Sequence, residues 1–275
     1  MKKILIPYNF SDTSENHLHY GINLAKQLSY SVVLLNVIPY PVVTPEIGLP
    51  AFSYGEMKDD SLKELQVVAA KIKRDESFDQ QIECTTDMGD VSESIVAYCN
   101  KHPVAFVVMG ISQHNNKVMK ALIGSNAVDT SRKTKCTVIV IPPGVSYKKP
   151  RTIAFASEAD SDPGNPSLEK TKKLSALFGA ELEILHVVSK EHHFSPGEVV
   201  IDNHFKNSSG HSPHTLFIIT EKKVSESLLG MLDNNLIDMI VVEPQKHNLF
   251  YKIFHESVSK EIAFASPVPV VFVHG

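Results

Sequence analysis

The chain has 275 residues, of which 43% are hydrophobic and 21% charged, a composition typical of a folded globular protein rather than a disordered one. Its formal net charge of −4 provides no basic field of the kind that binds nucleic acid by neutralising phosphates. No apolar run approaches the ~20 residues that span a membrane, and the short N-terminal run ends at Pro7, which favours a first strand over a signal peptide.

The first half of the chain alternates predicted strands and helices. A strand at 3–7 precedes a helix that begins at Ser11 or Asp12 and runs to about Leu28. Further strands are predicted at 31–37, 81–86, 105–109 and 137–141, and further helices at 56–75, 91–101 and 124–133. This order predicts a parallel, doubly wound five-stranded sheet with right-handed crossovers.

The second half repeats the first. The segment Leu24 to Val37 can be written above Leu174 to Val187, and each reads as a helix end, a short turn and a buried strand. Strands are predicted at 152–156, 181–187, 216–219, 239–242 and 270–273. A proline-rich, charged segment at 142–150 separates the halves, so we expect an α/β protein with two tandem domains, 1–146 and 147–275, each with its own five-stranded parallel sheet.

Cysteine usage indicates a reducing compartment. Cys84, Cys99 and Cys136 are scattered over the first half, and an odd number of such thiols argues against a disulfide framework. We expect a cytoplasmic protein whose cysteines pack as small hydrophobic side chains, with no neighbour that would lower the pKa of Cys99.

Ligands of such sheets bind beyond the carboxyl ends of the strands, where the strand order reverses. Gly110 directly follows a strand, and Gly124-Ser125 begins a helix, so backbone N–H groups there could face an anion. The spacing alone leaves a structural alternative open: Gly110 ends a strand, Gly124 relieves crowding, and Ser125 caps a helix.

Three segments resemble the universal stress protein family: KKILIPYNFSD (2–12), GDVSESIVAYCNKHPVAFVVMG (89–110) and ALIGSNAVDTSRKTKCTVIVIP (121–142). The resemblance covers almost all of the first half and extends more faintly to the second, so the chain is similar to a tandem member. The resemblance implies the five-stranded parallel fold. It also implies ATP binding in a subset of members, through a motif that consists of Gly-x-x-Gly, nine further residues, and Gly followed by Ser or Thr.

This chain departs from that motif in three places. Gln113 stands at the second glycine position, ten residues instead of nine separate it from Gly124, and Asn9 replaces an acidic residue common in the family. The resemblance nevertheless implies a set of nucleotide contacts, with any Mg²⁺ carried by the nucleotide. The implied contacts are Pro7, Tyr8 and Asn9 near the adenosine, Val37 against adenine, Met109 and Gly110 around the ribose and phosphates, and Gly124, Ser125, Asn126 and Ala127 around phosphate.

The second half is an internal control. Glu243 falls opposite Gly110, and His255-Glu256 falls opposite Gly124-Ser125, so carboxylates stand where a phosphate would approach. We expect no nucleotide there by the family's route. Because universal stress protein domains commonly dimerise through the edge near the last strand, the resemblance implies an intrachain pseudo-dimer, and further association into a homodimer stays open.

Other features have plainer interpretations. The histidines of the loop region 192–214 are irregularly spaced and have no cysteine beside them, so we expect a polar loop and no metal site. His17 and His19 are two residues apart on a predicted helix, and we expect them at the surface or at an edge. The sequence contains no Gly-x-Ser-x-Gly, GxxxxGK[ST] or GxGxxG segment.

The sequence therefore predicts a cytoplasmic regulatory or protective module, not an enzyme beyond slow ATP hydrolysis, that binds ATP or a related adenine nucleotide in its first domain. Two alternatives remain. One is a protein-interaction scaffold without nucleotide, with a partner protein that the sequence does not identify. The other is a nucleotide-dependent enzyme of the adenine-nucleotide α-hydrolase group.

Overall fold

The computed structural model describes residues 2–40, 54–111, 125–158, 165–188, 216–220, 232, 237–243 and 266–274. Its strands are β1 (Lys3–Pro7), β2 (Ser31–Ile38), β3 (Ile82–Met88), β4 (Val104–Gly110), β5 (Thr137–Ile141), β6 (Thr152–Glu158), β7 (Glu181–Val188), β8 (Leu216–Thr220), β9 (Met239–Val242) and β10 (Val270–Phe272). Its helices are α1 (Asp12–Leu28), α2 (Tyr54–Asp75), α3 (Val91–Lys101), α5 (Ser125–Lys133) and α6 (Pro166–Phe178). Every predicted strand is present, with bounds that differ from the prediction by two residues at most.

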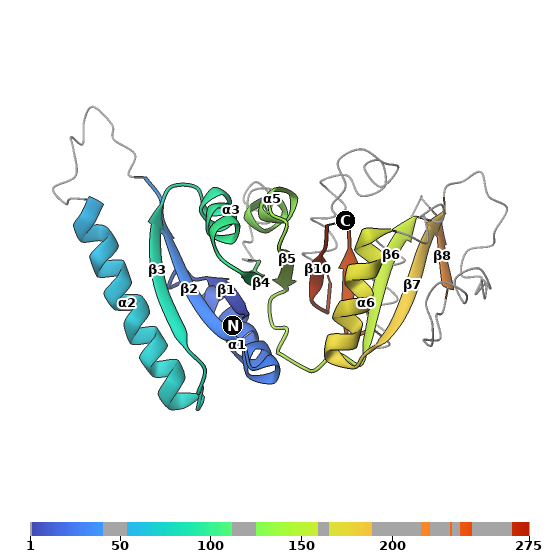
Figure 1. Cartoon of the computed structure of the whole chain (residues 1–275), viewed down its shortest axis with the longest axis horizontal. Helices are drawn as coiled ribbons and strands as arrows, with labels where there is room; N and C mark the ends of the chain where they lie inside the picture. The colour runs from blue at the N-terminus through green and yellow to red at the C-terminus, as the bar shows by residue number, and fades with distance from the viewer. Residues whose placement is uncertain are drawn as a thin grey trace.

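All ten strands belong to one sheet, in the order β3-β2-β1-β4-β5-β10-β9-β6-β7-β8 (Figure 1). The five strands of each half are parallel, and the order in the second half mirrors that in the first. The halves meet through an antiparallel pairing of β5 with β10, in which Ile139 lies opposite Val271.

The prediction that each half has its own separate sheet is therefore wrong, because the two sets of five strands join in one sheet. The last strand of each half would otherwise leave a row of backbone N–H and C=O groups unpaired. Pairing the two edges satisfies those groups within one chain, and the antiparallel direction follows from placing like edges against each other.

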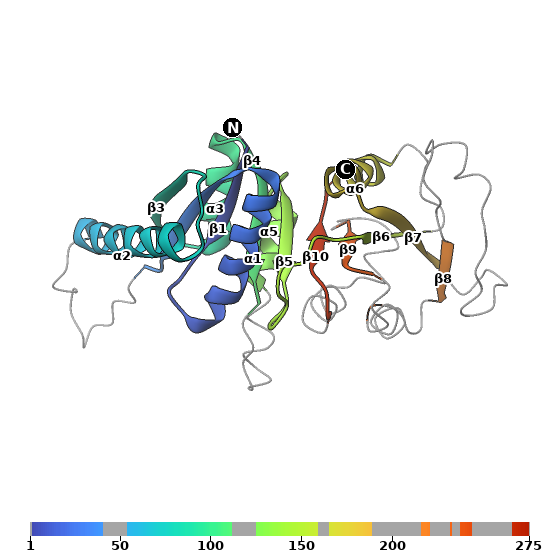
Figure 2. The ribbon, with the colours of Figure 1, turned by 90° about the horizontal axis from the view of Figure 1, so that it is seen from below.

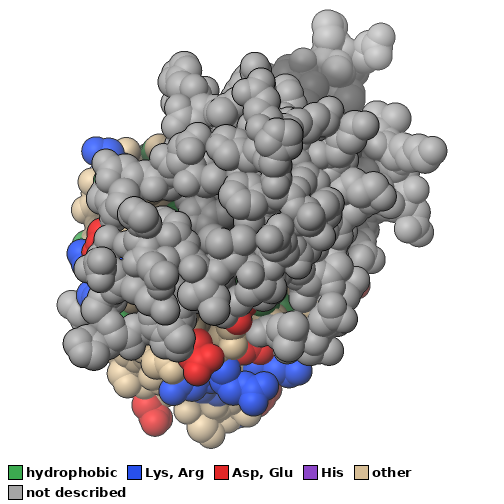
Figure 3. Space-filling model, turned by 90° about the vertical axis from the view of Figure 1, so that its right-hand side faces the viewer, with side chains coloured by type: hydrophobic (Ala, Val, Ile, Leu, Met, Phe, Trp, Pro, Cys, Tyr) green, Lys and Arg blue, Asp and Glu red, His purple; other side chains and the backbone are tan. Residues whose placement is uncertain are grey.

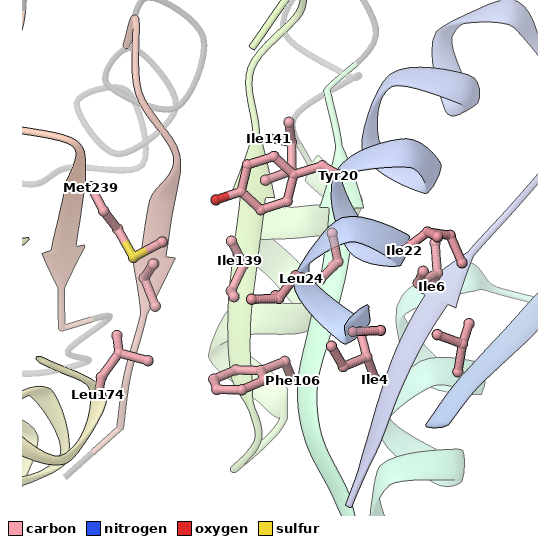
Figure 4. Close-up of a cluster of buried hydrophobic side chains, with 14 of the residues drawn as sticks. Ile4, Ile6, Tyr20, Ile22, Leu24, Phe106, Ile139, Ile141, Leu174 and Met239 are labelled. Carbon is pink, nitrogen blue, oxygen red and sulfur yellow. The ribbon is translucent and has the colours of Figure 1, made fainter. Parts of the chain in front are cut away.

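Helices cover both faces of the sheet (Figures 1 and 2). Residues of α1, α2 and α6 pack in the hydrophobic cluster on one face, whereas residues of α3 and α5 pack in the cluster on the other. The first cluster is continuous across the junction: Figure 4 shows Met239 and Leu174 of the second half facing Ile139 and Phe106 of the first. The halves thus share a core as well as a strand pair.

Charged side chains of both signs lie together on the described surface. On the face shown in Figure 3, Lys and Arg side chains gather beside Asp and Glu side chains along one edge. Lys172, for example, pairs with Glu169 at 2.7 Å in the second half. This mixing agrees with the small net charge of the chain.

Candidate functional site

A cavity of about 250 Å³ opens at the carboxyl ends of β1, β2 and β4. In the sheet, β1 lies between β2 and β4, so the chain leaves β1 toward one side and returns to the other side at β4. This is the point at which the strand order reverses, where ligands of open α/β sheets bind. The cavity is lined by Pro7, Tyr8, Asn9, Thr13, Ser14, His17, Leu35, Val37, Val91, Met109, Gly110, Asn126 and Ala127.

Eight of the ten predicted site residues line this one cavity. They are Pro7, Tyr8, Asn9, Val37, Met109, Gly110, Asn126 and Ala127. Gly124 lies outside the described residues, and so does the side chain of Ser125. The structure thus brings together residues from the ends of three strands and the start of α5, while their role as nucleotide contacts stays a prediction.

His17 is a cavity residue that the sequence analysis missed, and its predicted surface position is wrong. The side chain is 7% exposed, and Nε2 lies 2.8 Å from the carbonyl oxygen of Pro7. Nδ1 is buried without a hydrogen-bond partner. Burial lowers the pKa of His17, because the protonated ring would lose its hydration. The ring is therefore neutral at pH 7, with Nε2–H donating to Pro7 and Nδ1 as a bare acceptor.

The signal for a buried His17 was present in the helical spacing. Ser14, His17, Leu18, Gly21 and Ala25 follow the i, i+3, i+4, i+7, i+11 spacing of one helix face, and all of them are buried on α1. The prediction considered only the two-residue separation of His17 and His19. It did not consider where His17 lies relative to the apolar face of the helix.

Glycine is required at position 110 because the His17 ring packs directly against it. A Cβ at position 110 would stand 2.3 Å from Nδ1 of His17, well inside van der Waals contact. The sequence left open whether Gly110 admits an anion to the backbone or simply ends a strand. The structure supplies a second reason, which is the close packing of α1 against the end of β4.

Tyr8 and Asn9 connect β1 to α1 through side-chain hydrogen bonds. The Tyr8 hydroxyl donates to the Glu15 carboxylate, and burial together with this carboxylate raises the pKa of the phenol. Asn9 Oδ1 accepts from Ser11 Oγ at 2.7 Å and from Ser11 N at 3.3 Å. The group that Asn9 can offer a ligand is therefore its amide NH₂, a hydrogen-bond donor.

A buried polar pair holds the backbone at this end of β1. Asn36 Nδ2 donates to the Tyr8 carbonyl oxygen at 2.7 Å, and Ser61 Oγ of α2 donates to Asn36 Oδ1 at 2.9 Å. Sequence reasoning missed this pair, although one amide inside the apolar run of β2 was a usable signal. Asn36 thereby fixes the position of Tyr8 relative to β2.

The N-terminus of α5 faces the cavity through Asn126 and Ala127. Asn126 is exposed and Ala127 is buried against the core. The first turn of this helix carries no acidic residue. The N–H groups of a first helical turn and the positive end of the helix dipole are suited to an anion.

The corresponding position in the second half carries a carboxylate. Glu243 directly follows β9, whereas Gly110 is the last residue of β4. Glu243 Oε2 lies 3.4 Å from Nδ2 of Asn165, the N-cap residue of α6. The chain thus supplies its own anion near the start of that helix. His255-Glu256 and the histidine-rich region 192–214 lie outside the described residues.

In the parts of the chain that the structure describes, no group of three or more His, Cys, Asp or Glu side chains is placed to hold a metal ion. No helix among the same residues is both long and apolar enough to cross a bilayer.

Comparisons with known proteins point to one family. A sequence model of the Universal stress protein family matches residues 1–142. Universal stress protein MJ0531 of Methanocaldococcus jannaschii is 30% identical over 152 residues, which are 54% of this chain and 84% of that protein.

Solved structures share the fold of the whole chain. A universal stress protein from Archaeoglobus fulgidus matches with a TM-score of 0.72 at 20% identity, covering 99% of this chain and 96% of its own. A functionally unknown protein from Pseudomonas aeruginosa PAO1 matches with a TM-score of 0.57 at 11% identity, covering 99% and 92%. The family match over the first half, the relative at 30% identity and the cavity at the strand ends lead to one conclusion: the chain belongs to the universal stress protein family.

Proposed function

We propose that this protein binds ATP or a related adenine nucleotide in the cavity at the ends of β1, β2 and β4, and acts as a cytoplasmic regulatory or protective binding module rather than as an efficient enzyme. One observation carries the proposal. The residues that family resemblance assigned to the nucleotide come from separate parts of the chain, and those that can be placed line a single cavity.

The chemistry of the cavity suits a nucleoside with its phosphates directed toward α5. Leu35, Val37 and Val91 provide apolar surface for a base, and the amide of Asn9 provides a donor for a ribose hydroxyl. His17 Nδ1 is a buried acceptor without a partner at the wall of this cavity. Phosphates would lie at the helix N-terminus beside Asn126, and a Mg²⁺ ion would accompany them.

We also propose that the two halves, 1–146 and 147–275, are tandem domains that form an intrachain pseudo-dimer through β5 and β10. The mirrored strand order and the antiparallel junction support this arrangement. Only the first domain would bind nucleotide. Glu243 occupies the position of Gly110 in the second, where its charge would repel a phosphate.

A scaffold without nucleotide is the second candidate. It is favoured by Gln113, which replaces a motif glycine, and by the longer spacing to Gly124. In that case the shared core and the ten-stranded sheet would serve to present a surface to a partner protein, and the cavity would have no ligand.

Calorimetric titration distinguishes the candidates. The full chain is titrated with ATP, AMP and adenosine, followed by the variants Asn126→Glu and Asn126→Gln. Because Asn126 is exposed at the cavity rim, the added carboxylate should repel phosphate without affecting the fold. We expect Asn126→Glu to weaken ATP binding by about tenfold or more, which is ~1.4 kcal/mol, and to leave adenosine nearly unchanged.

Asn126→Gln is the matched neutral control and should bind ATP like the parent. Absence of ATP binding by the parent would support the scaffold, and equal loss of ATP and adenosine binding in Asn126→Glu would contradict the placement of phosphate. Turnover of ATP above ~1 s⁻¹ would instead indicate an enzyme of the adenine-nucleotide α-hydrolase group.

A further inference from the structure

A second cavity lies where the two halves of the chain meet. It has a volume of about 280 Å³ and opens beyond the carboxyl end of β5, beside the starts of β9 and β10. Its lining comes from both halves and from the segment that joins them: Tyr20, residues 144–146, Lys148, Ile237, Asp238 and residues 267–269. It shares no described lining residue with the cavity at the ends of β1, β2 and β4, so it is a separate candidate site.

Tyr20 reaches this cavity from the middle of α1. The residue is only 2% exposed, and Figure 4 shows its hydroxyl pointing away from the helix toward the second half. Among the described residues no hydrogen bond to this hydroxyl is present. Burial raises the pKa of the phenol, and the neighbouring Tyr147 and Asp238 act in the same direction, so Tyr20 stays protonated. A buried hydroxyl without a protein partner is uncommon and indicates a ligand or water as its partner.

Two opposite charges line the same cavity without pairing with each other. Lys148 is exposed and Asp238 is half-buried. Neither takes part in an ion pair within the part of the chain that the structure describes. Asp238 Oδ2 accepts the backbone N–H groups of Arg151 and Thr152 at 2.8 and 3.1 Å, which leaves Oδ1 for a further donor.

Apolar groups make up most of the remaining lining: Val145, Ile237, Pro267, Val268 and Pro269. Two turns hold these groups in place. Ser266 Oγ donates to the Val268 carbonyl oxygen at 2.6 Å and accepts the Val268 N–H at 3.2 Å, so the polar groups of that turn pair with each other. On the other side, the Val145 N–H donates to the Pro142 carbonyl oxygen at 3.2 Å. The wall between the polar groups therefore suits an aliphatic group of a ligand.

We propose that this cavity binds a small α-amino acid with an aliphatic side chain. The carboxylate of the ligand accepts hydrogen bonds from the Lys148 ammonium group and the Tyr20 hydroxyl, and its own ammonium group donates to Oδ1 of Asp238. The aliphatic side chain lies against the two prolines. Because the three polar groups come from the first half, the joining segment and the second half, a bound ligand connects the halves. The proposal does not depend on nucleotide binding.

The charges favour a zwitterion over a ligand with one charge. A carboxylate without an ammonium group would pair with Lys148 but would leave Asp238 unpaired and facing a like charge. An amine without a carboxylate would meet the same conflict at Lys148. A zwitterion gives each of the two side chains a charge-assisted hydrogen bond. The volume of the cavity, below the ~300–1,000 Å³ of sites for drug-sized ligands, limits the ligand to a small one.

Ligand-observed NMR titration of the full chain tests the proposal with three matched compounds. L-leucine carries both charges, 4-methylpentanoate is leucine without the ammonium group, and 3-methylbutylamine is leucine without the carboxylate. We expect leucine to bind at millimolar concentration and each analogue to bind at least about tenfold more weakly.

Two pairs of variants separate the site from the fold. Lys148→Gln should weaken the binding of leucine about tenfold, whereas Lys149→Gln, which changes an exposed lysine outside the lining, should not. Tyr20→Phe should weaken leucine about fivefold without lowering the urea midpoint, because the lost hydroxyl has no partner in the protein. Tyr147→Phe is its control, since the Tyr147 hydroxyl donates to Gln27 and does not line the cavity.

Four outcomes would overturn the proposal. The first is no binding of leucine to the parent at about 10 mM, and the second is an analogue that binds as tightly as leucine. The third is an equal loss of binding in Lys148→Gln and Lys149→Gln, which would indicate attraction by the basic segment as a whole. The fourth is unchanged leucine binding in Tyr20→Phe.

Discussion

His17 on α1 lies against Gly110 at the end of β4, with Nδ1 2.3 Å from the position that a Cβ would occupy there. The same imidazole contacts the Pro7 carbonyl oxygen at the end of β1 at 2.8 Å. One buried side chain thus joins the two strand ends that flank the reversal of strand order. The wall of the candidate site therefore depends on a glycine and a histidine together.

Gly110→Ala is expected to destabilise the protein by about 1–3 kcal/mol, because the new methyl group must displace the His17 ring. Urea unfolding followed by circular dichroism measures this difference. The Gly110→Ala substitution should also weaken nucleotide binding, since Gly110 and His17 both line the cavity.

The double variant His17→Ala/Gly110→Ala is the control for that clash. Removing the ring creates the room that the methyl group needs, so the combined loss should be smaller than the sum of the single losses. Additive losses would show that the alanine acts through something other than His17.

His17 should make stability depend on pH. Burial lowers its pKa in the folded state, whereas the unfolded chain takes up a proton near pH 6.5. Below about pH 6.5 the unfolded state therefore binds more protons, and the free energy of unfolding should fall with falling pH by up to ~1.4 kcal/mol per pH unit. The contribution is fully present above pH ~6.5 and is lost as the pH falls toward the folded-state pKa.

His17→Gln is the variant that isolates this effect. The glutamine amide can still donate to Pro7 but does not titrate, so the difference in pH dependence between parent and variant reports His17 alone. Urea midpoints at several pH values between about 5 and 8 provide the comparison. Parallel curves for the two proteins would exclude a neutral buried His17.

Asn36→Leu is expected to cost about 1–3 kcal/mol, because it leaves the Tyr8 carbonyl and the Ser61 hydroxyl buried without the partners they have now. Ser61→Ala removes only one hydrogen bond and should cost about 0.5–1.5 kcal/mol. If Asn36 also positions Tyr8 and Asn9 for a ligand, calorimetry should show weaker ATP binding in Asn36→Leu than in Ser61→Ala. Equal affinities would limit the role of Asn36 to stability.

The sequence predicted the strands and the edge of the sheet at which the cavity opens, because both follow from local patterns. Apolar runs such as that of β2 bury on both faces of a parallel sheet, and residues that follow strands gather at its carboxyl edge. The contact of His17 with Gly110 could not be predicted, because it joins residues 93 positions apart whose approach depends on how α1 packs.

The sequence did not predict the single ten-stranded sheet, for a different reason. Nothing in the sequence of β5 or β10 distinguishes an edge that pairs within the chain from one that pairs with a second chain. The family resemblance implied the edges that meet, and the antiparallel register of Val138 with Phe272 came only from the structure.

Asp238 is expected to stabilise the second half of the protein. Its Oδ2 accepts hydrogen bonds from the backbone N–H groups of Arg151 at 2.8 Å and Thr152 at 3.1 Å, where β6 begins beside β9. Asp238→Ala removes the acceptor of both and is expected to cost about 1–3 kcal/mol in urea unfolding. Asp238→Asn keeps a neutral oxygen acceptor and should lose less than half as much. If the two variants are equally stable, water replaces the side chain and Asp238 does not hold β6 in register.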